Sequence, residues 1–134
     1  HSVGGMAISF FMKNSGYQLA SKLIFLGAPA GFPGIFKNYI DLMGFNTRVR
    51  RGIEERVVDK FGQPSEYFNT AQFMSKIDCK GLIIHDQRDP VIPYSDAIEI
   101  QTAFRNSSLI TTNGLGHGLK GKLVINHILH FLKD

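Results

Sequence analysis

Three short segments of the chain each hold a side chain that can take part in nucleophilic catalysis. In chain order they are His1–Gly5, which contains a serine, His85–Pro93, which contains two aspartates, and Asn113–Gly118, which contains a histidine. A serine hydroxyl attacks a carbonyl carbon when a histidine removes its proton, and a carboxylate can orient that histidine. The residue types in the three segments therefore indicate acyl transfer through a serine nucleophile.

The first segment resembles the second half of a nucleophile elbow, the sharp turn G-x-S-x-G between a strand and a helix. Ser2 is followed by Gly4 and Gly5 and then by an apolar, helix-compatible run. Small neighbours allow strand and helix to approach, and the N–H of Val3 would point at the oxyanion that develops during attack. An ordinary helix-capping turn explains Ser-x-Gly-Gly equally well, so this segment alone decides nothing.

The other two segments supply a carboxylate and a base. Asp89 follows an apolar strand and precedes two prolines, which can hold a carboxylate rigidly, although it could instead cap a turn or pair with Arg88. Asp86 is a rival acid that lies closer to the end of the strand. His117 stands between glycines, which leave room for a substrate, although an exposed loop histidine would have the same flanks.

The order of these residues is more informative than any one of them. Ser2, Asp89 and His117 follow the chain order Ser, Asp, His, which distinguishes α/β-hydrolases from other folds with the same triad. One predicted helix and one predicted strand separate Asp89 from His117. Loops that follow parallel strands meet at the carboxyl edge of the sheet, so we expect both side chains at the same edge.

Strand and helix alternate along the chain, which predicts a parallel sheet with helices on its faces. Continuous apolar runs predict strands at 22–26, 81–85 and 108–112, and helices are predicted at 6–13, 94–105 and 122–133. In the closing helix we expect one apolar stripe directed at the core and the two histidines directed at solvent. The stripe is Val124, Ile125, Ile128, Leu129 and Leu132, and the histidines are His127 and His130.

The segment from about residue 32 to residue 77 differs from this pattern and is predicted to be a helical insertion. Glycine and proline interrupt it repeatedly, and it is rich in phenylalanine, tyrosine and methionine rather than in β-branched residues. Most of these side chains are expected to form the insertion's own core. Some are expected to line a pocket for an apolar group of a substrate.

The segments His1–Gly5, Ile84–Pro93 and Gly114–His117 resemble the α/β-hydrolase superfamily, in particular its small esterase-like and lysolipase-like members. The resemblance implies an α/β fold with about three parallel strands, flanking helices and a cap at about 32–77. It implies Ser2 as nucleophile, Asp89 as acid, His117 as base and Val3 as an oxyanion donor, without a cofactor. The implied substrate is a small molecule with an ester-type acyl bond.

The resemblance covers the C-terminal portion of one such domain, residues 1–134. We therefore expect strands and a second oxyanion donor to be missing, which would leave the isolated chain feeble or inactive. The alternative from another class is a non-catalytic folded or binding module that keeps hydrolase residues. We also expect self-association through strand 22–26, because loss of a neighbouring strand exposes an apolar edge.

Composition bounds the remaining possibilities. The net charge of +4 is small, and the cluster at Arg48, Arg50 and Arg51 is followed closely by acids, which favours a solvated helix face over a nucleic-acid site. No apolar run reaches the ~18 residues of a membrane span. No convincing metal-ligand spacing is present. The single cysteine, Cys79, suits a reducing compartment, and we expect a cytoplasmic protein.

Overall fold

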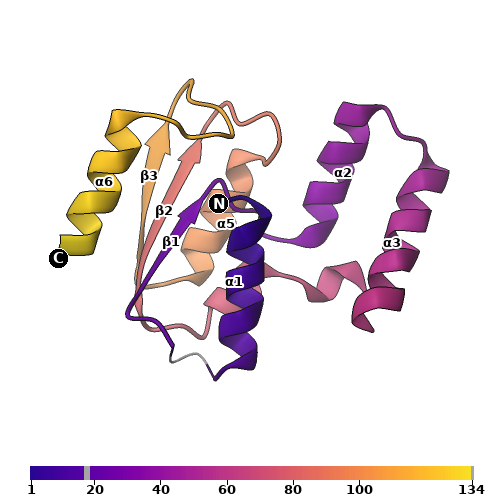
Figure 1. The fold of residues 1–134 in the computed structure, drawn as a ribbon, viewed down its shortest axis with the longest axis horizontal. Coiled ribbons are helices and arrows are strands. Elements are labelled where there is room, and N and C mark those ends of the chain that lie inside the picture. Colours follow the sequence, from indigo (N-terminus) through magenta and orange to yellow (C-terminus); the bar gives the residue numbers. More distant parts are fainter. Residues whose placement is uncertain (17–18, 134) are drawn as a thin grey trace.

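The computed structural model describes residues 1–16 and 19–133, and its centre is a parallel β-sheet (Figure 1). The strands are β1 (Lys22–Leu26), β2 (Lys80–Asp86) and β3 (Ser107–Thr112), in the order β1-β2-β3 with both pairs parallel. The three strands predicted from the apolar runs are confirmed to within one residue at each end.

Helices follow the strands as the alternating pattern predicts. The α-helices are α1 (Val3–Asn14), α2 (Phe32–Met43), α3 (Thr47–Phe61), α4 (Thr70–Met74), α5 (Tyr94–Ala103) and α6 (Lys122–Lys133), with a short 3₁₀ helix η1 (Ser65–Tyr67). Of the helices that the structure describes, none has the length and apolar character needed to cross a membrane.

Alternation of side chains along β1 divides the core into two layers. Leu23 and Phe25 belong to a cluster that includes residues of α1, α4 and α5. Ile24 and Leu26 pack against the other cluster, which contains Val124 of α6. Because successive side chains of a strand point to opposite faces, the sheet lies between two helical layers.

The closing helix α6 differs from the prediction in which side chains it buries. Val124 is buried and Ile128 packs against the same cluster, as expected, and Phe131 joins them. Ile125 and Leu129 are more than half exposed, at 56% and 51%. The prediction of one wide apolar stripe facing the core was therefore wrong. The sheet covers only a narrow row at positions i, i+4 and i+7, which are Val124, Ile128 and Phe131.

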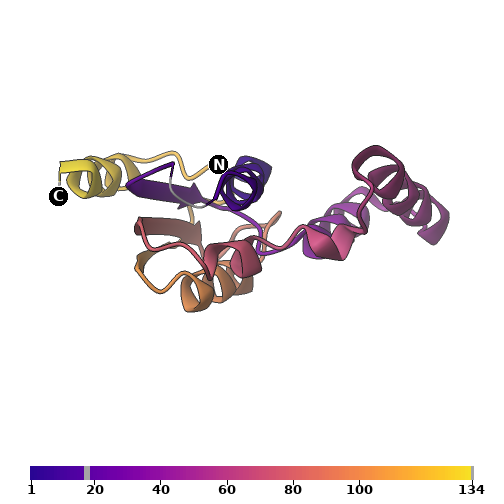
Figure 2. The same cartoon turned by 90° about the horizontal axis from the view of Figure 1, so that it is seen from below.

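The segment predicted as an insertion is helical and extends to one side of the sheet. Figures 1 and 2 both show α2 and α3 away from β3 and α6. The chain leaves and re-enters the core at a narrow neck, where Gly31 forms an antiparallel bridge with Asn69. The N–H of Phe32 donates to the carbonyl of Phe68 at 3.1 Å. Beyond the neck, α4 packs in the same cluster as α1 and α5.

Candidate active site

The three side chains singled out in the sequence lie together at the carboxyl edge of the sheet. Asp89 follows β2 and His117 follows β3, while Ser2 reaches the end of β1 because its N–H donates to the carbonyl of Leu26 at 2.8 Å. Nε2 of His117 is 3.0 Å from Oγ of Ser2, and Nδ1 of His117 is 2.8 Å from Oδ2 of Asp89. Hydroxyl, imidazole and carboxylate are thus connected in series.

The backbone of Ser2 adopts a conformation that few residues other than glycine take. Its φ is 54° and its ψ is −135°, at the position immediately before α1. Such a conformation costs on the order of 1–3 kcal/mol and persists only where the surroundings enforce it. The bond from Ser2 N–H to Leu26, together with the start of α1 at Val3, supplies that constraint and leaves the hydroxyl directed at His117.

The close approach of α1 to the sheet depends on Gly5. A Cβ added at Gly5 would lie 2.7 Å from Cβ of Ala28 and 2.9 Å from the ring of Phe25. A Cβ added at Gly4 would meet nothing within 4 Å. The sequence pattern indicated small residues after the serine, and the structure assigns the tight contact to the second of the two glycines.

Of the two candidate acids, Asp89 is the one that contacts His117. Its side chain is fully buried, and its second oxygen, Oδ1, accepts from the N–H groups of Val91 and Ile92 at 2.8 and 3.0 Å. These bonds form a turn that holds the carboxylate still, as an aspartate that accepts from the following amides does. Asp86 is also fully buried, but its hydrogen bonds go to backbone amides and to Thr112.

Two neighbours of His117 were not identified from the sequence. Nε2 of His1 donates to the carbonyl of His117 at 2.8 Å, and the two rings lie 4.9 Å apart. Gly27 has a φ of 54°, and a Cβ there would lie 3.5 Å from both Asp89 Oδ2 and His117 Nδ1. For Gly27, the available sequence signal was the turn Gly27-Ala28-Pro29 after a predicted strand. Nothing in the sequence marked His1.

Polar groups behind Asp89 also lie inside the protein. Nε2 of His85 donates to the carbonyl of Ile92 at 3.0 Å, and the side chain is completely buried. Asp96 accepts from the N–H of Ala30 at 2.9 Å. Burial raises the pKa of Asp96, and the bond from Ala30 and the nearby His85 only partly offset it.

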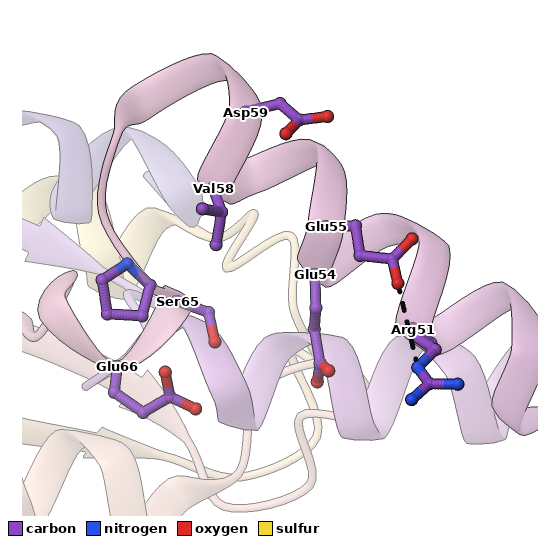
Figure 3. Close-up of a pocket in the computed structure, with 8 residues that line it drawn as sticks. Arg51, Glu54, Glu55, Val58, Asp59, Ser65 and Glu66 are labelled. Carbon is purple, nitrogen blue, oxygen red and sulfur yellow. Dashed lines mark ion pairs between the residues drawn. The ribbon is translucent and has the colours of Figure 1, made fainter.

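Two hollows differ in character. One of about 270 Å³ is lined entirely by apolar side chains: Val3, Met6, Ala7, Phe10, Phe32, Phe61 and Phe68. The other lies between α3 and η1 and is open and largely acidic, with Glu54, Glu55, Asp59 and Glu66 around it (Figure 3). Its basic residue, Arg51, pairs with Glu55 at 3.8 Å, and both side chains are exposed. No group of three metal-ligating residues occurs in residues 1–16 and 19–133.

Solved structures share this fold at low sequence identity. Est1E from Butyrivibrio proteoclasticus superimposes with a TM-score of 0.67 and 16% identity, over 98% of this chain and 57% of that one. The esterase domain of a Rhodothermus marinus protein gives 0.61 and 18%, over 90% and 50%. The esterase RhEst1 from Rhodococcus sp. ECU1013 gives 0.63 and 14%, over 99% and 63%. This chain therefore spans roughly half to two thirds of their lengths.

No curated protein sequence matches the chain. The family model described as TAP-like protein, an α/β-hydrolase family, matches residues 62–134. That match includes β2, α5, β3 and α6, together with both loops that hold Asp89 and His117. The chain therefore belongs to the TAP-like family of α/β-hydrolases.

Proposed function

We propose that this chain carries the catalytic residues of a serine hydrolase that cleaves an ester-type acyl bond. The observation that supports the proposal best is the continuous series from Ser2 Oγ through His117 to Asp89, with separations of 3.0 and 2.8 Å. The esterases of the same fold are consistent with it. The activity of the whole protein is part of the proposal, since the chain spans only part of their length.

Each residue would have a distinct role in the reaction. His117 Nε2 removes the proton of Ser2 as Oγ attacks the carbonyl carbon, and the alcohol leaves with that proton to form an acyl-enzyme. Water then attacks the acyl carbon while His117 takes its proton; the bond to Ser2 Oγ breaks, Oγ receives that proton from His117, and the carboxylic acid leaves. Asp89 holds the proton on Nδ1 of His117 and stabilises the imidazolium that forms in each step.

The N–H of Val3 would stabilise the oxyanion. Val3 is the first residue of α1, and the first amides of a helix have no acceptor within the helix. The amide of the residue after the nucleophile is the usual donor in a nucleophile elbow. Loss of one such donor typically costs ~3–4 kcal/mol of transition-state stabilisation.

The apolar hollow supports an apolar acyl group as the substrate's recognised part. Val3 lines the hollow and directly follows Ser2, so an acyl chain attached to Oγ would start next to it. The other walls come from α1 and from Phe32, Phe61 and Phe68. The last three belong to the segment of about 32–77, which we propose is a cap over the substrate site.

A fluorophosphonate probe tests the nucleophile directly. We expect the chain to be labelled at one residue, identified as Ser2 by peptide mass spectrometry, and to hydrolyse p-nitrophenyl acyl esters. The variant Ser2→Ala should lose both labelling and turnover. Ser108→Ala is the matched control, because Ser108 is exposed on β3, away from the sheet's carboxyl edge, and should leave both unchanged.

The alternative, a non-catalytic module, predicts a different outcome of the same experiment. Under it, neither the chain nor Ser108→Ala would be labelled above the level of Ser2→Ala. Stoichiometric labelling that depends on Ser2 would exclude this alternative. Turnover that survives Ser2→Ala would contradict the proposed nucleophile.

We also propose that copies of the chain associate through β1. This strand lies at one edge of the described sheet, and Ile24 and Leu26 are half-buried on it. An unpaired, apolar edge is a template for pairing with another chain. Light scattering should detect dimers or larger species that Ile24→Lys reduces. A monomer at all concentrations would refute the association.

A further inference from the structure

The carboxylate of Asp86, at the end of β2, is completely buried and accepts four hydrogen bonds. Its Oδ1 accepts from the N–H of Arg88 at 2.9 Å and from the N–H of Gly114 at 3.2 Å. Its Oδ2 accepts from Oγ1 of Thr112 at 2.7 Å and from the N–H of Leu115 at 2.8 Å. No ion pair among the described residues includes Asp86, so neutral donors account for its bonds.

Three of these donors come from two loops, and the fourth, Thr112, is the last residue of β3. Arg88 immediately precedes Asp89 in the loop after β2, whereas Gly114 and Leu115 precede His117 in the loop after β3. Oδ1 by itself connects the loop after β2 to the loop after β3, because it accepts a hydrogen bond from one amide of each loop. The carboxylate therefore fixes the separation between the backbone that carries Asp89 and the backbone that carries His117.

The loop that carries His117 needs such an anchor. Gly114 and Gly116 have φ values of 93° and 60°, a region that glycine enters freely and other residues rarely enter. A loop with two glycines around its functional residue can adopt many conformations in the absence of fixed contacts. The two amides bound by Asp86 lie two and three positions before His117, so they restrict the loop directly before the imidazole.

The ionised carboxylate is the form that fits these four donors. Burial opposes ionisation of Asp86, but the hydrogen bonds from Thr112, Leu115, Arg88 and Gly114 outweigh it and hold its pKa below the usual value. An asparagine has the same shape but only one acceptor oxygen. Its amide group would face at least one N–H donor, and the loop would have to move away from that clash.

We propose that Asp86 is a positioning residue, which aligns His117 with Asp89 and Ser2 by binding the loop amides. The inference rests on the proposed function for its effect on catalysis. The structural part of it, the alignment of the His117–Asp89 pair, does not require activity. Asp86 touches neither His117 nor Ser2 in the contacts of the described residues, so it acts through the loops alone.

Asp86→Asn and a matched control test the inference. Asn113→Ala removes an exposed side-chain contact between the same two loops, the 3.4 Å bond from Asn113 Nδ2 to Gln87 Oε1. We expect Asp86→Asn to lower kcat for a p-nitrophenyl ester, and the rate of fluorophosphonate labelling, by about 100-fold, the scale of a displacement of about 1 Å. KM should change less than about twofold, and Asn113→Ala should leave all three unchanged.

A second measurement does not depend on activity. Proton NMR should show a downfield signal for the Nδ1 proton of His117, and Asp86→Asn should abolish it while Asn113→Ala keeps it. In the unchanged chain, the amide protons of Gly114 and Leu115 should exchange slowly with solvent despite their place in a surface loop. The exchange measurement still applies if Asp86→Asn fails to fold.

The outcomes separate this inference from the proposed function. Absent labelling of the unchanged chain would refute the hydrolase, while the NMR signals still decide whether Asp86 aligns His117. Fast exchange of the Gly114 and Leu115 amides would overturn the inference. An Asp86→Asn variant that folds, keeps the His117 signal and labels at the original rate would overturn it as well.

Discussion

Nε2 of His85 lies 3.4 Å from Oδ2 of Asp89, the same carboxylate oxygen that faces His117. The shorter contact of His85 is to the carbonyl of Ile92, at 3.0 Å, so Nε2 carries a proton and donates it to that carbonyl. Its other nitrogen, Nδ1, is buried without a partner among the described residues. His85 is thus a fully buried side chain that packs behind Asp89 and binds the carbonyl of Ile92.

Replacement of His85 should destabilise the protein. In His85→Phe an aromatic ring is kept, although a larger one, and the buried carbonyl of Ile92 loses its donor, which costs about 1–3 kcal/mol. Urea denaturation measures the loss of unfolding free energy. His127→Phe on α6 is the control and should change it by less than about 0.5 kcal/mol, as partly exposed positions usually do. Equal effects of the two variants would contradict the support by His85.

Adjacent glycines in α1 should respond in opposite ways to alanine. In Gly5→Ala the new methyl group would overlap Ala28 and Phe25, and such overpacking costs about 1–3 kcal/mol. In Gly4→Ala it meets nothing, and the better helix propensity should add up to about 1 kcal/mol. Thermal unfolding compares the two. A Gly5→Ala variant as stable as Gly4→Ala would refute the close approach of α1 to β1.

The pH dependence of stability should show the state of Asp86. Its pKa is below the ordinary 3.8 in the folded chain, so its ionisation stabilises the fold above about that pH and the contribution is lost as the pH falls. The difference in unfolding free energy between the unchanged chain and Asp86→Asn should therefore be larger at pH 7 than at pH 3.

Asp96 supplies a control of opposite sign, because burial raises its pKa. Its contribution to stability is present at low pH and is lost as the pH rises through the raised pKa. Asp96→Asn should therefore be less destabilising, relative to the unchanged chain, at pH 7 than at pH 3. Parallel trends for Asp86→Asn and Asp96→Asn would contradict these assignments.

Selectivity for acyl length should depend on the apolar hollow beside Val3. Ala7 lines this hollow, so Ala7→Phe should reduce hydrolysis of p-nitrophenyl octanoate about 10-fold relative to the acetate, the scale of a few lost apolar contacts. Ile8, the next residue of α1, is exposed and does not line the hollow. Ile8→Phe should leave the ratio unchanged. An equal loss for both esters in Ala7→Phe would contradict an acyl site there.

Much of the fold follows from local sequence patterns. The strands were predictable because parallel strands buried on both faces are continuous apolar runs, such as Leu23–Leu26. The face that α6 buries was not, since Ile125 and Leu129 are as apolar as Val124 and only the position of the sheet distinguishes them. Apolar periodicity defines a helix, but tertiary packing decides which row it covers.

The candidate site, like the fold, could be predicted from the sequence only in part. Ser2, Asp89 and His117 could be predicted as candidates because their order and their flanking glycines or prolines are visible in the sequence itself. Asp86 accepts hydrogen bonds from backbone amides of a loop that is distant in sequence, and every residue except proline carries such an N–H, so residue types do not indicate these contacts. His1 and His117 are 116 positions apart in the sequence, and residue types alone could not indicate their contact.

The neck at Gly31 and Asn69 has a consequence for how such a protein can diversify. The chain between Phe32 and Phe68 departs and returns at neighbouring points, so its length and sequence can change without altering the strand ends. Both Asp89 and His117 belong to the later strand–helix–strand unit, which this segment does not interrupt. The segment between the two neighbouring points can thus change in sequence and length while the backbone that positions Asp89 and His117 stays the same.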